Sequence, residues 1–189
     1  NVKRMLAYSG IEHMGIVMLG VAAGGIGYYA AVLHIILHAF VKSSLFFQFN
    51  QLYRVFQDKS IYHIGNYFKY NATGAMVLLF GFISATAMPP SGLFVSEFLI
   101  FKSIFDAGQI VLLIAVLLLL TLIIFAFGKN IFKILFIPAV GFDDSNVEKI
   151  SPWESLSQFL FLAFAVYLGL NPPAIFVQLL KDSVSLLPM

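Results

Sequence analysis

The sequence predicts an all-α protein whose helices form a polytopic transmembrane bundle. Three observations lead to this fold class. The chain of 189 residues is 60% hydrophobic and only 11% charged, its mean hydropathy is +0.93, and its apolar residues fall in long runs. A soluble domain carries roughly 25% charged residues, and about 20 consecutive apolar residues in a helix cross the hydrocarbon core of a bilayer. The chain therefore lacks the charges that a water-exposed surface requires.

Composition also excludes several classes of function. The net charge of +2 is small and no block of Lys and Arg occurs, so we expect no nucleic-acid partner. The chain has no cysteine, which excludes disulfides, a thiolate nucleophile and cysteine ligation of iron–sulfur centres. We expect no catalytic residue, bound cofactor or metal on this chain, and any redox centre should lie on a partner.

Five spanning elements are predicted from the apolar runs, followed by a short amphipathic tail after Pro173. The predicted spans are 10–28, 29–49, 74–106, 109–136 and 153–171. Gly20, Gly24 and Gly25 have the small-residue spacing that permits close helix packing. The chain begins with Asn rather than Met, and we expect it to be a piece of a longer protein.

The third span is expected to be one helix, broken at 89–91 by Pro89 and Pro90. Two successive prolines remove two backbone donors and disfavour helix in the preceding residue, and Gly92 lets the chain turn and the helix restart. A hairpin of two short spans is the alternative. With Lys3 and Arg4 in the cytoplasm, the broken helix places eight basic residues of the loops and helix ends inside and two outside, against seven and three for the hairpin. Loop charge therefore favours the broken helix, a feature that marks ion sites in transporters.

His34, His38 and Lys42 form a row with spacing i, i+4, i+8 in an otherwise apolar run. On a helix they share one face. A Lys at the bilayer centre costs about 2.5–3.5 kcal/mol and should face the protein interior or a hydrated path, and His suits proton transfer near neutral pH. The row thus indicates a proton relay. Alternatively, Lys42 snorkels at a helix end and the histidines only bond neighbouring helices. Zinc binding by His34 and His38 is not favoured, because neither a third His nor a Cys lies nearby in the sequence.

Glu97 lies just beyond the break, among apolar residues. A lone carboxylate at that depth stays neutral unless it finds a cation, and we expect Lys42 or a histidine to be its counterpart. An intramembrane acid beside broken backbone indicates function; the alternative is a neutral Glu bonded to a loosened carbonyl. Glu12 and His13 lie near the start of the first span, where they either take up protons from the cytoplasmic side or form a solvated helix end.

Three stretches together resemble a known family: VKRMLAYSGIEHMG, LHIILHAFVKSSLFF and AMPPSGLFVSEFLIF. They are similar to the C-terminal half of the antiporter-like, proton-conducting subunits shared by respiratory complex I, group 4 (hydrogenase 4 or formate-hydrogenlyase) hydrogenases and multi-subunit sodium/proton antiporters. The resemblance implies a bundle with two inverted repeats, of which this chain is the second repeat, with its broken helix, plus C-terminal helices. Complex I subunits of other types and the cation antiporters usually carry Lys at the position of Glu97, so the chain looks most like the hydrogenase-type members of the family or their closest complex I relative.

The resemblance also implies roles and partners. It makes His34, His38 and Lys42 the central relay, from which protons pass to Glu97. Other membrane subunits would be the partners, with nickel–iron and iron–sulfur centres or flavin on them, in the plasma (inner) membrane of a bacterium or archaeon. The chain would then belong to an oxidoreductase or translocase complex without holding its redox centre. Two alternatives are a sodium/proton antiporter subunit without a redox partner and a truncated chain that inserts but conducts nothing.

Overall fold

The computed structural model describes residues 1–139, 141–142 and 147–185, and this part of the chain contains helices and loops but no strand. The helices are α1 (Val2–Ala23), α2 (Ile26–Phe56), α3 (Tyr67–Tyr70), α4 (Ala72–Ala85), α5 (Gly92–Asp106), α6 (Ile110–Phe136), the 3-10 helix η1 (Pro152–Ser155), α7 (Leu156–Leu170) and α8 (Ala174–Ser185). Four helical segments are long and apolar enough to cross a membrane: α1, α2, α6 and η1 with α7. The predicted all-α class is confirmed.

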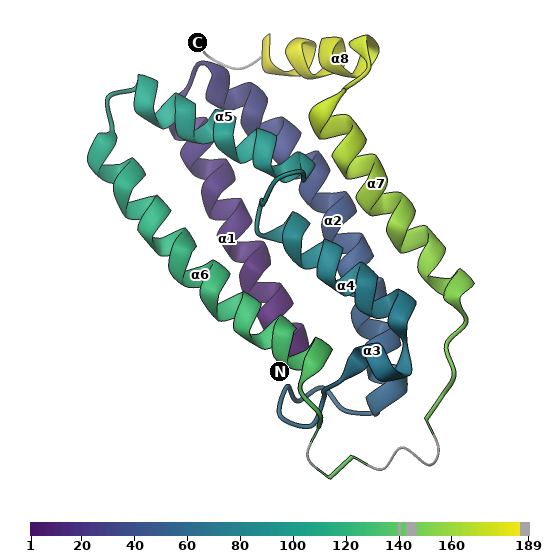
Figure 1. Ribbon diagram of the computed structural model, residues 1–189. Helices are drawn as coiled ribbons and strands as arrows, with labels where there is room; N and C mark the ends of the chain where they lie inside the picture. Colours follow the sequence, from purple (N-terminus) through teal and green to yellow (C-terminus); the bar gives the residue numbers. More distant parts are fainter. Residues whose placement is uncertain (140, 143–146, 186–189) are drawn as a thin grey trace.

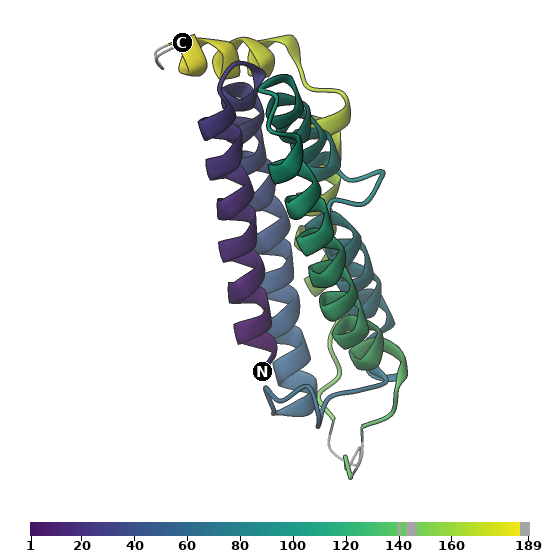
Figure 2. The same cartoon turned by 90° about the vertical axis from the view of Figure 1, so that its left-hand side faces the viewer.

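α1 and α2 form a tight antiparallel pair, and α2 is the central helix of the fold (Figures 1 and 2). α1 ends at Ala23 because Gly24 and Gly25 have φ values of 72° and 55°, a region that is costly for residues with a Cβ. A Cβ added at Gly27 would lie 2.2 Å from the carbonyl oxygen of Gly20, so the two backbones touch. Of the small residues predicted to permit packing, Gly20 does so, whereas Gly24 and Gly25 form the turn.

Both helices are longer than the predicted spans 10–28 and 29–49, and the turn between them comes earlier. α1 begins at Val2 because the Asn1 side chain caps it, accepting hydrogen bonds from two backbone N–H groups of the first turn. α2 continues to Phe56 through a polar stretch. Hydropathy locates the apolar part of a helix, whereas caps and turns determine where the helix ends.

One interrupted element is formed by α4 and α5. In both views α4 occupies the lower half of the bundle and α5 the upper half. Residues 86–91 connect the two helices at mid-height (Figures 1 and 2). The broken-helix prediction is therefore confirmed, although the break is wider than 89–91. Ala87 has a φ of 47°, while Pro89 and Pro90 are exposed. The helix restarts at Gly92 as predicted, behind the Ser91 cap, whose side chain accepts a backbone N–H of the first turn. Gly92 has no positive φ, so its backbone conformation does not require a glycine.

Gly92 instead permits a close contact between α5 and α7. A Cβ at Gly92 would lie 2.1 Å from the carbonyl oxygen of Ala165, and a Cβ at Gly169 would lie 2.2 Å from the Gly92 Cα. The two helices thus meet backbone to backbone. α7 also packs along α2, so α2 is surrounded by α1, α4, α5 and α7.

The remaining segments close the ends and one side of the bundle. Arg54, near the end of α2, binds Glu148 and Glu154, with 2.9 Å between the Arg54 Nε and the Glu148 Oε1, and so ties the chain before α7 to α2. α6 lies at the side with mostly exposed apolar residues. The predicted tail forms α8, which crosses the upper end (Figure 1).

Candidate functional site

His13 lies fully buried in the middle of α1 and faces both α2 and the broken helix. Its Nδ1 is 3.0 Å from the Nε2 of His34 on α2 and 3.7 Å from the Oε1 of Glu97 on α5. Its Nε2 is 2.9 Å from the carbonyl oxygen of Ala85. A single side chain therefore contacts α2 and both halves of the broken helix.

The break supplies partners for this histidine pair. The last four carbonyl groups of a helix lack intrahelical partners, and Ala85 is the last residue of α4. Beyond the break, the Ser96 Oγ lies 2.9 Å from the Nδ1 of His34 and donates to the Leu93 carbonyl at 3.0 Å. Ser96 is fully buried, and the sequence patterns did not single it out.

The predicted row on α2 is present. The His34 and His38 rings are nearly parallel, at 14°, with centroids 6.3 Å apart, and the His38 ring also lies 4.7 Å from the ring of His13. The Nε2 of His38 is buried and has no hydrogen-bond partner among the described residues. Lys42 is buried and its Nζ donates to the Leu6 carbonyl at 2.9 Å and to the Ser9 Oγ at 3.0 Å.

One of the two counterparts expected for Glu97, a histidine, lies beside it. Its ion-pair partner in the described part of the chain is a histidine, His13 on α1, rather than Lys42. Because α1 and α2 run antiparallel, Lys42 lies level with the first turns of α1, whereas His34 lies level with the break. His13 contacts both His34 and Glu97, and so connects the row on α2 to the broken helix.

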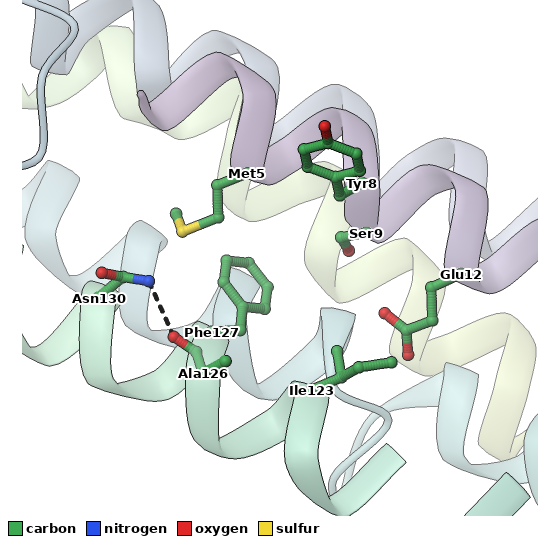
Figure 3. A pocket seen from close by; sticks show the side chains of 8 residues that line it. All are labelled: Met5, Tyr8, Ser9, Glu12, Ile123, Ala126, Phe127 and Asn130. Carbon is green, nitrogen blue, oxygen red and sulfur yellow. Dashed lines mark hydrogen bonds between the residues drawn. The ribbon is translucent and has the colours of Figure 1, made fainter. Parts of the chain in front are cut away.

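Glu12 points into a cavity between α1 and α6 (Figure 3). The cavity has a volume of about 250 Å³ and is lined by Met5, Tyr8, Ser9, Glu12, Ile123, Ala126, Phe127 and Asn130. The Glu12 carboxylate interacts electrostatically with Lys42 and with Glu97. Ser9 connects the cavity to Lys42 through its hydroxyl.

Glu12 and His13 were expected together at the start of a span. Because α1 begins at Val2, both lie in mid-helix, and the 100° step between neighbouring helical residues gives them different surroundings. The spacing of Leu6, Ser9 and His13, by three and then four residues, indicates one buried face. That spacing is the sequence signal that could have placed His13 in the core.

Three buried side chains could hold a metal ion. Ligand atoms of His13, His34 and Glu97 all lie within 4.8 Å of one another. This set differs from the His34 and His38 pair considered from the sequence. Its members come from three helices, so no spacing within the sequence predicts it.

Comparison with known proteins places this network in a family. The family model described as "NADH:quinone oxidoreductase/Mrp antiporter, TM" matches residues 1–123, a segment that includes every residue of the buried network. The chain belongs to this family. The resemblance drawn from the three sequence stretches is thereby confirmed.

Relatives in this family carry the names of two kinds of complex. "Hydrogenase-4 component F homolog" of Methylacidiphilum infernorum is 33% identical over 106 residues, which cover 56% of this chain and 22% of the relative. "NADH-quinone oxidoreductase subunit M" of Escherichia coli K12 is 30% identical over 118 residues, 62% of this chain and 23% of the relative. "NADH-quinone oxidoreductase subunit N 2" of Symbiobacterium thermophilum is 28% identical over 99% of this chain and 37% of the relative. The chain thus spans well under half the length of these relatives.

A solved structure shows the same fold. A chain in the "Structure of Mrp complex from Dietzia sp. DQ12-45-1b" superposes with a TM-score of 0.81, covering 96% of this chain and 42% of that chain at 17% sequence identity. Family membership and the apolar helices together establish that the chain is part of an integral membrane protein.

Proposed function

We propose that the full-length protein containing this chain translocates protons across the membrane as a subunit of a redox-driven complex. The observation that carries the proposal is the contact of His13 with both His34 and Glu97, at 3.0 Å and 3.7 Å, inside the bundle. Buried imidazoles within hydrogen-bond distance can pass a proton, and intramembrane ionisable residues are functional by default. The histidine pair is the centre of the proposed path.

The path runs along the face that α1 and α2 share. Its cytoplasmic part is formed by Glu12, which lines the cavity between α1 and α6, and by Lys42, which donates to Ser9 of the same lining. From the cytoplasmic side, His38, His34 and His13 carry the proton toward the middle of the bundle, and Glu97 receives it at the broken helix. Charge changes in partner subunits would drive each transfer by altering the stability of the protonated histidine or glutamate.

The relatives named hydrogenase-4 component F and NADH-quinone oxidoreductase subunit M support a redox-driven complex of either kind. In both cases the nickel–iron, iron–sulfur or flavin centres would lie on partner subunits, since this chain has no cysteine. The protein would lie in the plasma membrane of a bacterium or archaeon. Purification of the intact complex, followed by nickel analysis and assays of hydrogen evolution and NADH oxidation, distinguishes the two kinds.

A sodium/proton antiporter is the second candidate, since the Mrp complex shares the fold. The donor set of the site favours the proton. Hard cations prefer cages of oxygen ligands, whereas two of the three convergent atoms here are imidazole nitrogens. An antiporter would show sodium-dependent proton exchange without any redox protein in the purified complex.

Replacement of Glu97 tests the proposed function. In the full-length complex reconstituted in liposomes, Glu97→Gln should abolish proton uptake, measured with a pH-sensitive dye, because the amide accepts no proton. Asp106→Asn is the matched control, since Asp106 ends the same helix and forms a surface pair with Lys102. Normal proton uptake by assembled Glu97→Gln would remove Glu97 from the path.

A further inference from the structure

The partners of His13 and His34 determine which ring nitrogens carry hydrogen. A carbonyl only accepts, so the His13 Nε2, 2.9 Å from the Ala85 carbonyl oxygen, must donate. The Ser96 hydroxyl donates to the Leu93 carbonyl, so its oxygen accepts from the Nδ1 of His34. The His13 Nε2 and the His34 Nδ1 therefore both carry hydrogen. In the neutral rings the other two nitrogens, the His13 Nδ1 and the His34 Nε2, each have a lone pair instead.

Those two inner lone pairs face each other. The Nδ1 of His13 and the Nε2 of His34 are 3.0 Å apart, and two acceptors at this distance repel unless a cation lies between them. The Glu97 carboxylate is 3.7 Å from the His13 Nδ1. His13, His34 and Glu97 are thus arranged around a position that suits one positive charge, which in the proposed function is the transferred proton.

The same three atoms suit a transition-metal ion. Two imidazoles and one carboxylate form a ligand set of zinc sites, with bonds of about 2.0–2.2 Å. Tetrahedral bonds of that length place neighbouring ligand atoms roughly 3.4 Å apart, and the observed separations of 3.0 Å and 3.7 Å lie on either side of this value. All three ligand atoms lie within 4.8 Å of one another, so His13, His34 and Glu97 would have to close in on the ion by at most a little over an ångström.

The outer contacts are those of metal-ligating histidines. Such histidines donate their second ring N–H to a carbonyl, carboxylate or water, which fixes the tautomer and orients the ring. Here the Ala85 carbonyl accepts from His13, and Ser96 accepts from His34. Glu12, on the wall of the cavity between α1 and α6, interacts electrostatically with Glu97.

We propose that His13, His34 and Glu97 form a binding site for a zinc-like divalent transition-metal ion. The ion occupies the position of the transferred proton and stops transport while bound. Binding stands on the ligand geometry alone, whereas the block of transport rests on the proposed function.

Zinc binding is tested on the full-length protein in its purified complex, washed with a chelator and dialysed against radioactive zinc. Wild type should hold one more zinc per chain than Glu97→Gln and His34→Gln. His63→Gln is the control, because His63 is an exposed histidine in the loop after α2, and it should retain the wild-type zinc content. Equal zinc in wild type and both site variants would overturn the site.

Ser96→Ala tests the orienting contact. Loss of such a partner lowers metal affinity by roughly 10- to 100-fold. Ser103→Ala is the matched control: Ser103 is buried on the same helix and its hydroxyl also bonds the carbonyl three residues earlier, that of Ile100. Ser103→Ala should leave zinc affinity unchanged. An equal loss of affinity in the two variants would contradict the proposal that Ser96 orients His34 for metal binding.

Glu97→Cys separates ligation from a general structural effect. A thiolate is a softer ligand than a carboxylate, so the variant should bind cadmium more tightly relative to zinc than wild type does. An unchanged cadmium-to-zinc ratio would overturn the assignment of Glu97 as a ligand.

The two proposals fail separately. Transport that is lost in Glu97→Gln without any change in zinc content would overturn the metal site and leave the proton path standing. Zinc that binds at the site without slowing proton transport would overturn the path through His13 and leave the metal site standing.

Discussion

Each ring nitrogen of His13 has a partner on a different helix, and this makes His13 the residue on which the proposed relay depends most. His13→Gln retains an amide that can bond the Ala85 carbonyl but cannot pass a proton to His34. Positioned acids and bases contribute about 10²–10⁴-fold to proton-transfer rates, so we expect dye-measured proton uptake to fall by that order. His63→Gln, at an exposed position, should leave it unchanged. A His13→Gln complex with wild-type uptake would exclude His13 from the relay.

At this scale the sequence predicted the residue types better than their contacts. His34, His38, Lys42 and Glu97 were identified because polar residues in apolar runs are conspicuous. Their partners were not, because Ser96 lies among apolar residues like many structural serines, and the Ala85 acceptor is backbone. A contact between α1 and α5 depends on how helices pack, which spacing within one helix does not reveal.

Asp58 organises the short loop that follows α2. Its carboxylate accepts hydrogen bonds from the backbone N–H of Ser60 and from the Nδ1 of His63, and these contacts, with Ser60 the largest, hold the pKa of Asp58 below its usual value. A lowered pKa adds stability above the unfolded value of about 3.9, and that stability is lost as the pH falls through the folded value.

Acid should therefore loosen this loop before it unfolds the helices. We expect protection of the Ser60 amide from hydrogen exchange, corrected for the intrinsic rate, to fall between about pH 5 and pH 2. Asp58→Asn should be weakly protected at every pH, and Asp106→Asn should behave as wild type. A pH dependence that persists in Asp58→Asn would assign it to another group.

Among the elements, the contact between α5 and α7 leaves no room for a side chain. Gly169→Ala places a methyl group 2.2 Å from the Gly92 Cα, and such overpacking typically costs 1–3 kcal/mol, so we expect a destabilisation of about that size. Gly15→Ala is the control, because Gly15 is helical with open space around its Cβ position in the described structure. It should stabilise the helix by up to about 1 kcal/mol. Thermal unfolding of the full-length protein in detergent measures both, and equal effects would argue against a close contact.

Element bounds show where hydropathy stops being informative. The broken helix was predicted because two prolines and loop charge agree, whereas the ends of α1 and α2 were misplaced. Those ends depend on the Asn1 cap and on the positive φ of Gly24 and Gly25, which leave no mark on a hydropathy profile.

For the whole molecule, the broken helix fixes which ends share a side of the membrane. The loop after α2 lies at the end of the bundle that also holds the N-terminus, and α8 lies at the opposite end (Figure 1). With the predicted orientation, Tyr62 in that loop is cytoplasmic and Lys181 in α8 is outside.

The absence of native cysteine in the chain makes this orientation directly testable. Tyr62→Cys should react with a membrane-impermeant maleimide only after cells are opened, and Lys181→Cys should react in intact spheroplasts. Labelling of both variants from the same side would contradict the broken helix, and the reversed pattern would invert the predicted orientation.

The end of α4 at Ala85 has an electrical consequence. In a continuous helix the peptide dipoles cancel along its length, and the fractional charge of about half an electron remains only at the ends. Ending α4 in mid-bundle brings the negative end of a helix dipole to the His13 Nε2. A permanent backbone field at this nitrogen therefore favours positive charge on His13, and this field adds to the effect of the side chains around it.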